Sequence, residues 1–262
     1  MINSALMNVM IAAALKAGRG LKRDFGELEN LQVSLKGPGD FVTAADRRAE
    51  TVLVDALSKA RPGYGFVLEE GGTIRGTDQS HTWFIDPLDG TTNFLHGLPI
   101  FAVSIALARE NQIVAGLIHN PATGDMYVAE KGQGAFQNNR RLRVAARRGL
   151  EGALIGCGIP HVGKSKEHPR FAAELKAVMA KANNLRRLGA AALDLCFVAA
   201  GSYDGFWERN LQAWDVAAGI IMVREAGGFV TDADGGSDML AKGSVCAGNE
   251  PIQRELLALI RS

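Results

Sequence analysis

Cysteine is scarce in this sequence. The 262 residues include three cysteines, Cys157, Cys196 and Cys246, which lie far apart in apolar surroundings and form no C-x-x-C pair. We interpret them as buried thiols in a reducing compartment, because an odd and scattered set suits neither a disulfide framework nor a zinc site. The five histidines form no pair at helical spacing, which also argues against a zinc enzyme.

Net charge and long apolar runs are missing as well. The formal charge is +1, so the chain as a whole has no strong attraction to nucleic acid or to an anionic membrane. No apolar run is long enough to cross a bilayer, and residues 1–18 lack the basic start of a signal peptide. We therefore expect a cytoplasmic protein with no membrane partner and no direct nucleic-acid contact. The pairs Arg140-Arg141 and Arg186-Arg187 are interpreted as solvated.

The remaining composition is that of a globular protein, with 47% hydrophobic and 22% charged residues. Periodicity predicts a helix over residues 4–18, ended by Gly18 and Gly20, and a second helix over 44–60, capped by Thr43. The other expected elements are strands at 66–68 and 83–85, an antiparallel meander of strands at 101–108, 113–118, 126–129 and 141–144, further strands at 153–157, 185–188, 205–208, 229–231 and 244–247, and helices at 171–182, 190–200, 214–226 and 251–260.

The pattern changes near Arg147-Arg148, where the meander gives way to alternating strands and helices. We therefore expect a mixed α/β (α+β) fold in layers. It is divided into an N-terminal lobe, residues 1–147, and a C-terminal lobe, residues 148–262. The N-terminal lobe is expected to consist of a helix pair and an antiparallel sheet.

The segment from Trp83 to Thr92 reads Trp-Phe-Ile-Asp-Pro-Leu-Asp-Gly-Thr-Thr. An apolar strand is expected to end at Pro87, which leaves Asp86 and Asp89 on a short, stiff turn. Gly90 allows close approach of a ligand, and the two threonines can start a helix whose free N–H groups attract anions. The segment predicts a divalent metal with a phosphate, although taken alone it fits a plain turn better.

Further acids stand at the ends of other predicted elements. Asp46 lies in the first turn of the second helix, Glu69-Glu70 follows a strand, and Asp215 opens a late helix. Carboxylates are the ligands that Mg²⁺ prefers, and two such ions can assist an in-line displacement at phosphorus. Taken alone, Asp46 and Asp215 each fit better as acids that complement a helix N-terminus, and the glutamate pair could be solvated. The residues alone therefore leave a metal site as one of two interpretations.

Five motifs, in order and spacing, give the whole chain a specific resemblance to the inositol monophosphatase family of Mg²⁺-dependent, lithium-sensitive phosphatases, and especially to its bacterial extragenic-suppressor type. They are the Asp40-Phe41-Val42-Thr43 run with Asp46, the Glu69-Glu70 pair, the segment Trp83 to Phe94, the run Gly189 to Leu195, and the stretch from Trp214-Asp215 to Glu225-Ala226-Gly227-Gly228. The resemblance implies a layered α-β-α-β-α sandwich of the sugar-phosphatase type and a homodimer.

The resemblance also implies roles for individual residues. The metal ligands would be Glu69, Asp86, the Leu88 carbonyl, Asp89 and Asp215, holding two or three Mg²⁺ ions that Li⁺ antagonises. Thr91 would orient the attacking water, Asp46 would accept its proton, and Glu69 would take part in catalysis. The substrate contacts would be the N–H groups of Gly90 and Thr91 for phosphate, and Asp89, Ala191, Glu208 and Asp215 for the alcohol. An exposed strand acid is the alternative for Glu208.

The implied function is hydrolysis of inositol 1-phosphate or a similar polyol phosphate by a metal-activated water. The alternatives are a related phosphatase for histidinol phosphate, fructose 1,6-bisphosphate or adenosine 3′,5′-bisphosphate, or an accessory protein of transcription or RNA processing.

One feature of the sequence departs from the family pattern, and another predicts an irregular loop. Leu68 and Gly71 flank the glutamate pair where Gly and Ser are usual, and Lys36, before Gly37-Pro38-Gly39, is expected on an irregular loop that could act as a lid.

One motif suggests a different enzyme class. Residues Gly158 to Ser165 match the phosphate-binding loop pattern G-x-x-x-x-G-K-[ST] and follow a predicted strand. Pro169, however, would interrupt the helix that such a loop requires near Lys164, and Pro160 stiffens the loop. We therefore expect a connection from strand to helix near the mouth of the substrate site.

Overall fold

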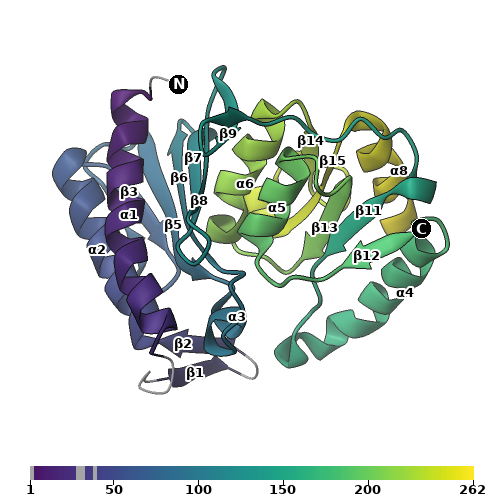
Figure 1. Cartoon of the computed structure of the whole chain (residues 1–262), viewed down its shortest axis with the longest axis horizontal. Helices are drawn as coiled ribbons and strands as arrows, with labels where there is room; N and C mark the ends of the chain where they lie inside the picture. Colours follow the sequence, from purple (N-terminus) through teal and green to yellow (C-terminus); the bar gives the residue numbers. More distant parts are fainter. Residues whose placement is uncertain (1–2, 28–32, 38–39) are drawn as a thin grey trace.

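The computed structural model describes residues 3–27, 33–37 and 40–262, and arranges them in five layers (Figure 1). A helix pair covers one face of a large sheet, a second pair fills the space between this sheet and a smaller one, and a third pair covers the far face of the smaller sheet. From one side to the other the helices are α1 (Ala5–Phe25) and α2 (Ala44–Ala60), α5 (Ala191–Ala199) and α6 (Ala213–Glu225), and α4 (His168–Met179) and α8 (Glu250–Ile260). The expected α-β-α-β-α sandwich is confirmed.

The large sheet has the strand order β10-β9-β8-β7-β6-β5-β3-β4. All neighbours are antiparallel except β3 and β5, which run parallel. The strands are β3 (Gly65–Leu68), β4 (Gly72–Ile74), β5 (His81–Asp89), β6 (Ala102–Arg109), β7 (Gln112–Asn120), β8 (Asp125–Glu130), β9 (Gly134–Gln137) and β10 (Arg140–Arg141). Because β3 and β5 are parallel neighbours, the residues that follow them, including Glu69, lie at the same edge as the end of β5.

The smaller sheet has the order β12-β11-β13-β15-β14, with the first three strands parallel and the others antiparallel. Its strands are β11 (Leu154–Cys157), β12 (Asn184–Arg186), β13 (Gly205–Arg209), β14 (Phe229–Thr231) and β15 (Ser244–Gly248). The other elements are the hairpin of β1 (Val33–Gly37) and β2 (Asp40–Thr43), the short helices α3 (Thr91–Leu95) and α7 (Met239–Lys242), and the 3₁₀ turns η2 (Leu150–Gly152) and η3 (Val162–Glu167).

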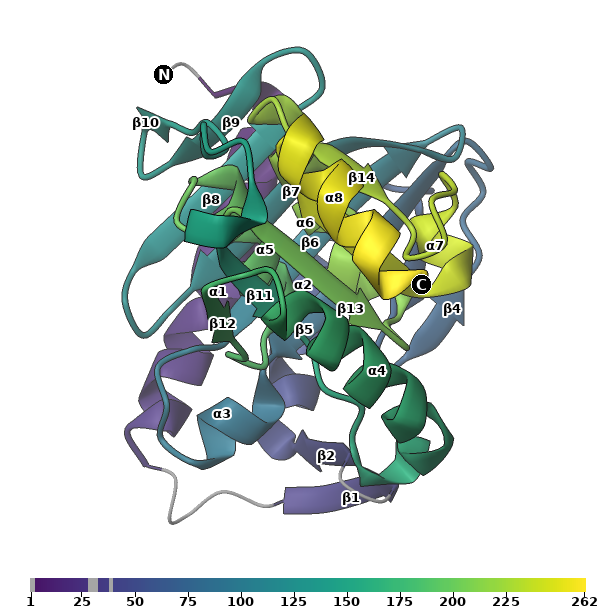
Figure 2. The same cartoon turned by 90° about the vertical axis from the view of Figure 1, so that its right-hand side faces the viewer.

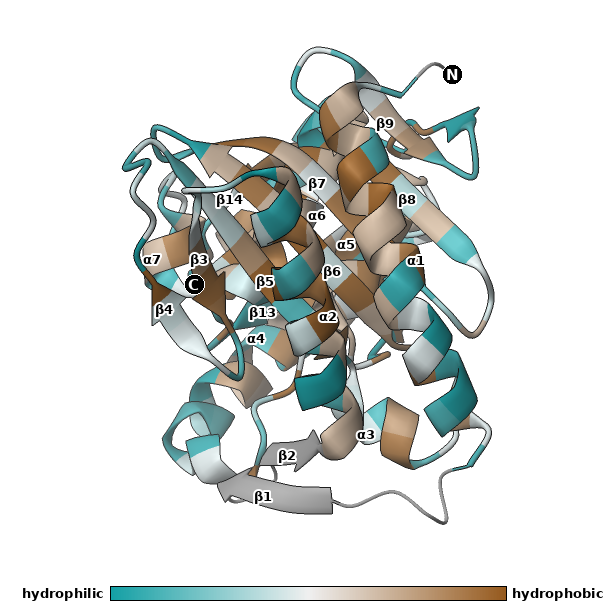
Figure 3. Ribbon diagram, turned by 90° about the vertical axis from the view of Figure 1, so that its left-hand side faces the viewer, coloured by the Kyte–Doolittle hydropathy of each residue, from teal (hydrophilic) through white to brown (hydrophobic). Residues whose placement is uncertain are grey.

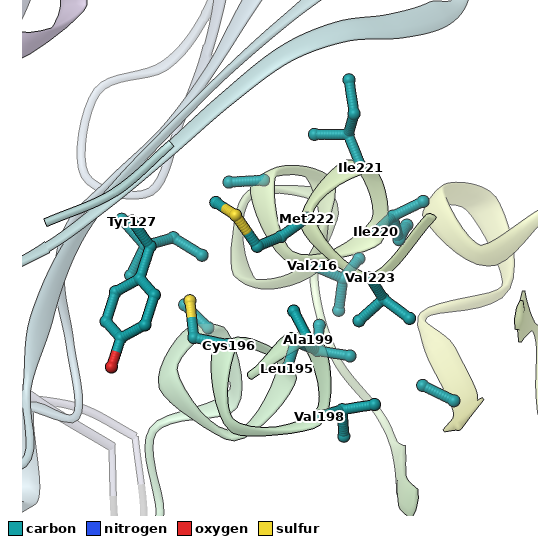
Figure 4. Close-up of a cluster of buried hydrophobic side chains, with 14 of the residues drawn as sticks. Tyr127, Leu195, Cys196, Val198, Ala199, Val216, Ile220, Ile221, Met222 and Val223 are labelled. Atoms are coloured by element: carbon teal, nitrogen blue, oxygen red, sulfur yellow. The ribbon is translucent and has the colours of Figure 1, made fainter. Parts of the chain in front are cut away.

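The central helices α5 and α6 are apolar on nearly every side because both are enclosed. Figure 4 shows Leu195 and Cys196 of α5 facing Val216 and Met222 of α6, with Tyr127 of the large sheet beside them. By contrast, α1 and α2 bury one face each and turn hydrophilic residues outward (Figure 3). Each large apolar side chain that is fully buried contributes roughly 1.5–3 kcal/mol. This packing fixes the ends of α2, α5 and α6 relative to the large sheet.

Two sequence predictions about the ends of elements were wrong. Helix α1 does not end at Gly18 but continues to Phe25, since its buried face extends through Leu21 and Gly18 lies against the ring of His119. Strand β5 does not end at Pro87 but continues to Asp89. The proline is accommodated because the ladder is already interrupted there by a bulge.

Other predictions need smaller corrections. The expected strand 141–144 is the end of the two-residue β10, and β9 was not predicted, because its four residues are too few to show a pattern. Lys36 belongs to β1 and so lies in a strand instead of an irregular loop, while Pro38 and Gly39 fall outside the described residues. The hairpin of β1 and β2, the short strand β4 and the short helix α7 were not predicted either, whereas the remaining helices and strands agree with the expected ranges to within a few residues.

Candidate active site

An open cleft with about 260 Å³ of solvent-accessible space lies where the ends of β3, β5 and β13 meet the N-termini of α3, α5 and α6. Nine of the predicted site residues line it together: Glu69, Asp86, Leu88, Asp89, Gly90, Thr91, Ala191, Glu208 and Asp215. Asp46, the tenth, is fully buried and reaches the cleft through Thr91. The fold therefore assembles residues that are separated by up to about 170 positions in the chain.

A bulge at the end of β5 places the two central aspartates. Asp86 pairs with Ser104 and Asp89 with Ala102, so Pro87 and Leu88 together oppose a single residue of β6. Such bulges redirect side chains next to active sites. Here the Asp86 carboxylate turns back to accept a hydrogen bond from the Leu88 N–H at 2.9 Å. Both aspartates, three residues apart, therefore reach the same cleft.

The turn after the bulge depends on Gly90. Its φ of +87° lies in the left-handed region, and a Cβ atom there would come within 2.7 Å of the Ile100 carbonyl oxygen. Gly90 is the N-cap of α3, whose first N–H groups have no acceptor inside the helix. Thr91, the first residue of α3, has its hydroxyl 3.0 Å from the Leu88 carbonyl and 3.3 Å from the Asp46 carboxylate. This hydroxyl therefore joins α2 to the floor of the cleft.

Helix α2 supplies a second acid that was not predicted. Glu50 stands one turn after Asp46 on the same buried face and accepts a hydrogen bond from the Glu70 N–H at 2.9 Å. It thereby fixes the glutamate pair that follows β3. Burial raises the pKa of Glu50, and the charges of Glu70 and Glu69 raise it further. The four-residue spacing from Asp46 is a signal in the sequence from which Glu50 could have been found.

The first turns of α5 and α6 fix two more carboxylates of the cleft, those of Asp89 and Asp215. Asp89 accepts a hydrogen bond from the Ala192 N–H at 2.8 Å, in the first turn of α5. Asp215 forms a capping box at the start of α6, where its carboxylate accepts from the Gln212 N–H at 2.7 Å. The interpretation of Asp215 as a helix-capping acid is therefore correct, and the same residue also lines the cleft.

Burial and repulsion act together on the aspartates of β5. The pKa of Asp86 is well above its usual value because the group is buried and because Glu69, Asp89 and Asp215 are negatively charged neighbours. Burial raises the pKa of Asp89 to about 7, although the Ala192 N–H opposes the rise. The cleft thus concentrates negative charge that its own hydrogen bonds do not fully compensate.

The side of the cleft formed by β13 and α5 contains a second acidic pair, Glu208 and Asp194. Burial, followed by the charges of Asp194 and other acids, raises the pKa of Glu208, while the Arg187 guanidinium lowers it. Burial also raises the pKa of Asp194 to about 7. The Tyr203 hydroxyl opposes that rise, yet neither it nor the Asp194 carboxylate has a hydrogen-bond partner with regular geometry. Arg187, exposed at the rim, brings a positive charge to this side.

The donor set fits hard divalent cations. Carboxylates and a backbone carbonyl are oxygen ligands of the kind that Mg²⁺ and Ca²⁺ prefer, and a cation would relieve the repulsion that raises the pKa of Asp86. Within residues 3–27, 33–37 and 40–262, however, no three His, Cys, Asp or Glu side chains already close around one point at ligand distance. The metal assignment therefore rests on donor chemistry and on the mutual repulsion of the carboxylates.

The loop that resembles a phosphate-binding motif borders the cleft from the other side. Ile159 and His161, which sequence reasoning did not identify as site residues, both line it. Beyond them the chain forms the 3₁₀ turn η3, and α4 starts only at His168, with Pro169 in its first turn. A phosphate-binding loop needs a regular helix beginning near Lys164, so the expected connection at the mouth of the site is the better description.

Comparison with known proteins agrees with this arrangement. The model of the inositol monophosphatase family matches residues 3–262. An inositol-1-monophosphatase of Mesorhizobium japonicum is 62% identical over 261 residues, which cover 100% of this chain and 98% of the relative. The crystal structure of the extragenic suppressor protein suhB from Bartonella henselae superposes with a TM-score of 0.96 at 57% identity, covering 99% of each chain.

A relative of lower identity has a different name. The Nus factor SuhB of Pseudomonas aeruginosa is 42% identical over 259 residues, which cover 98% of this chain and 96% of the relative. In the part of the chain that the structure describes, no helix is long and apolar enough to span a membrane. The match to the family model extends over almost the whole chain, and it includes every residue of the cleft. The chain therefore belongs to the inositol monophosphatase family and is a phosphoric monoester hydrolase.

Proposed function

We propose that the protein hydrolyses inositol 1-phosphate, or a closely similar polyol phosphate, with Mg²⁺ as cofactor. The observation that carries this proposal is the convergence of Glu69, Asp86, Asp89 and Asp215 on one cleft that also contains the N-terminus of α3. Phosphoryl transfer is mainly a matter of positioning and charge neutralisation, and this combination supplies fixed positions and the ligands for cations that would neutralise the phosphate. The relatives named inositol-1-monophosphatase support the choice of alcohol.

The metal ligands we propose are Glu69, Asp86 and the Leu88 carbonyl for one ion, and Asp86, Asp89 and Asp215 for another. Bound Mg²⁺ would neutralise phosphate charge, lower the pKa of a water and stabilise the leaving oxygen. The chain's own contribution is to hold these donors at fixed positions, through the bulge in β5 and the capping box of α6. We propose that Li⁺ inhibits by competing at this site.

The attacking water is proposed to bind at Thr91. Its hydroxyl has one hydrogen, which can be donated to the Leu88 carbonyl at 3.0 Å or to the Asp46 carboxylate at 3.3 Å, and its oxygen lone pairs can accept a hydrogen bond from a water molecule in the cleft. Asp46 is then the acceptor to which the proton passes, with Glu69 on the opposite side of the water. The N–H groups of Gly90 and Thr91 are proposed to hold the phosphate.

The alcohol is proposed to lie between Glu208, Asp215 and the start of α5 at Ala191, which all line the cleft. A carboxylate such as Glu208 accepts hydrogen bonds from adjacent hydroxyl groups of a polyol. The substrate would thus lie between the two lobes expected from the sequence, residues 1–147 and 148–262. We further propose that the protein acts as a cytoplasmic homodimer, as the family resemblance implies.

The test is phosphate release from a panel of phosphomonoesters during a titration with Mg²⁺, with and without Li⁺. The panel contains inositol 1-phosphate, histidinol phosphate, fructose 1,6-bisphosphate and adenosine 3′,5′-bisphosphate. We expect Mg²⁺-dependent release that is fastest with inositol 1-phosphate and is inhibited by Li⁺. Absence of Mg²⁺-dependent release from all four would refute the proposal, and preference for another ester would reassign the substrate.

A second candidate function is an accessory role in transcription, which the name of the Pseudomonas relative, Nus factor SuhB, favours. This role would not need the carboxylates of the cleft. It predicts that a strain carrying Asp89→Asn keeps the phenotype of the wild type, whereas the phosphatase function predicts the phenotype of a deletion. Both strains can be compared directly with a deletion strain.

A further inference from the structure

Helix α4 is fastened to β13 by one buried carboxylate that plays no part in the mechanism above. Glu174 is 5% exposed, and its Oε2 accepts a hydrogen bond from Trp207 Nε1 at 3.2 Å. Its Oε1 accepts from Arg209 Nε at 2.7 Å and from Arg170 Nε at 3.2 Å. Two guanidinium groups and an indole therefore share a single carboxylate.

The two residues held on β13, Trp207 and Arg209, flank Glu208 in the sequence. Because side chains alternate along a strand, the two flanking residues point towards α4 while Glu208 points to the opposite face, into the cleft. Arg209 is fixed further, by the Ala233 carbonyl at 3.1 Å and by Asp234 at 3.3 Å. Rotation of the strand end would turn Glu208 away from the cleft and would break these contacts at the same time.

The same helix also holds the loop on the other side of Glu208. Gly158 lies so close that a Cβ atom there would be 1.8 Å from the carboxyl carbon of Glu208. The loop then presents Ile159 and His161 to the cleft and ends in α4, where His168 contacts the Pro160 carbonyl oxygen at 3.1 Å. Figure 2 shows α4 lying in front of the smaller sheet, with this loop at one end of the helix.

We propose that Glu174 is a positioning residue for the alcohol half of the cleft. Glu174 holds Trp207 and Arg209 on the α4 face of β13 and so sets the direction of Glu208 on the opposite face. By anchoring α4 it also sets the distance between Glu208 and the rim at Ile159–His161. The inference rests on the proposed function, since it takes Glu208 as the group that binds the hydroxyls of the substrate. Glu174 thus controls selection of the alcohol without touching it, and it leaves the metal and phosphate side unaffected.

The experiment compares Glu174→Gln with wild type on two esters: inositol 1-phosphate, and 4-nitrophenyl phosphate, whose leaving group has no hydroxyl for Glu208. Gln keeps the volume and one acceptor oxygen but removes the charge that holds Arg209. We expect kcat/KM for inositol 1-phosphate to fall by about tenfold, mainly through KM, as for the weakening of one charged hydrogen bond. The value for 4-nitrophenyl phosphate should change by less than about twofold.

Glu225→Gln is the matched control. Its carboxylate also accepts two hydrogen bonds, from the N–H groups of Gly132 and Gly134, but it lies at the opposite end of α6 from Asp215. We expect it to leave the ratio of the two kcat/KM values unchanged. Should Glu174→Gln fail to fold, Trp207→Phe removes one of the three donors while keeping an aromatic ring and tests the same contact.

A double-mutant cycle separates positioning from general stability. If Glu174 acts through Glu208, the double variant E174Q/E208A loses no more activity on inositol 1-phosphate than Glu208→Ala alone. Equal losses on both esters, or additive losses in the cycle, would overturn the inference while leaving the proposed function intact. A wild-type protein that cleaves only the aryl ester would instead overturn the proposed function, and with it the basis of this inference.

Discussion

The hydroxyl oxygen of Thr91 lies 3.3 Å from the carboxylate of Asp46, although 45 residues separate them in the chain. The contact joins the first residue of α3 to the first turn of α2, behind the carboxylates of the cleft. Since Asp46 is fully buried, it can exchange a proton with the cleft only through a neighbour such as this hydroxyl.

The first prediction concerns this pair. We expect Asp46→Asn to lower kcat by about 10²–10⁴-fold, the usual contribution of a general base, with little change in KM. Steady-state kinetics on inositol 1-phosphate measures both. Asp55→Asn, on the exposed side of the same helix, is the control and should behave as wild type. Equal effects of the two substitutions would contradict the relay.

The second prediction concerns charge repulsion. Asp89→Asn removes one negative charge beside Asp86 while keeping an acceptor for the Ala192 N–H. In the presence of a chelator, we expect the melting temperature to rise by about 2–4 °C for each 1 kcal/mol of repulsion relieved. The same variant should be inactive, as is common when a functional site is strained. A lower melting temperature in chelator would show that repulsion is not the dominant effect.

The third prediction is the pH dependence of stability. The pKa values of Asp89 and Asp194 are raised to about 7, mainly by burial. A folded state that holds a proton more tightly than the unfolded state loses stability as the pH rises. Without divalent metal, the contribution of these two groups to the free energy of unfolding should therefore be largest below about pH 4. It should then decrease as the pH rises to about 7.

Calorimetric melting curves between about pH 5 and 8, in chelator, measure this effect. Addition of Mg²⁺ should flatten the dependence, because a bound cation favours the charged carboxylates. Asp194→Asn should reduce the slope without abolishing it. A melting temperature that increases steadily over this range in chelator would contradict the assignment.

The fourth prediction tests the turn at Gly90. Gly90→Ala combines a φ of +87° with a contact of 2.7 Å to the Ile100 carbonyl. Gly124→Ala has a similar φ of +79° but open space around the new methyl group, so the difference between the two isolates the clash. We expect Gly90→Ala to lower the free energy of unfolding by about 1–3 kcal/mol more than Gly124→Ala in urea denaturation.

The fifth prediction separates two enzyme classes. Lys164 lies on the exposed turn η3, outside the residues that line the cleft. We expect Lys164→Ala to keep kcat/KM within about twofold of wild type, as surface substitutions usually do. A large loss of activity would revive the interpretation of residues 158–165 as a phosphate-binding loop.

The motif around Asp86 could be recognised in the sequence because its residues are adjacent. Proline, glycine and two acids within a few positions restrict the backbone so strongly that a turn at a strand end was expected from local chemistry alone. The bulge was not expected, since it depends on the partner strand β6 and not on β5 itself. For the same reason the sequence placed the end of β5 at Pro87 and not at Asp89.

What the sequence determined by itself is therefore local: the periodic faces of the helices, the glycine that the turn requires, and the motifs that mark the family. The tertiary structure decided which distant groups meet. Glu174 and Arg187 belong to none of the motifs recognised in the sequence, because their roles come from contacts with residues tens of positions away. Packing of α4 against β13, and of α5 and α6 between the two sheets, brings these groups to the cleft. Such packing depends on the burial of apolar side chains across the whole fold, and no short segment of the sequence specifies it.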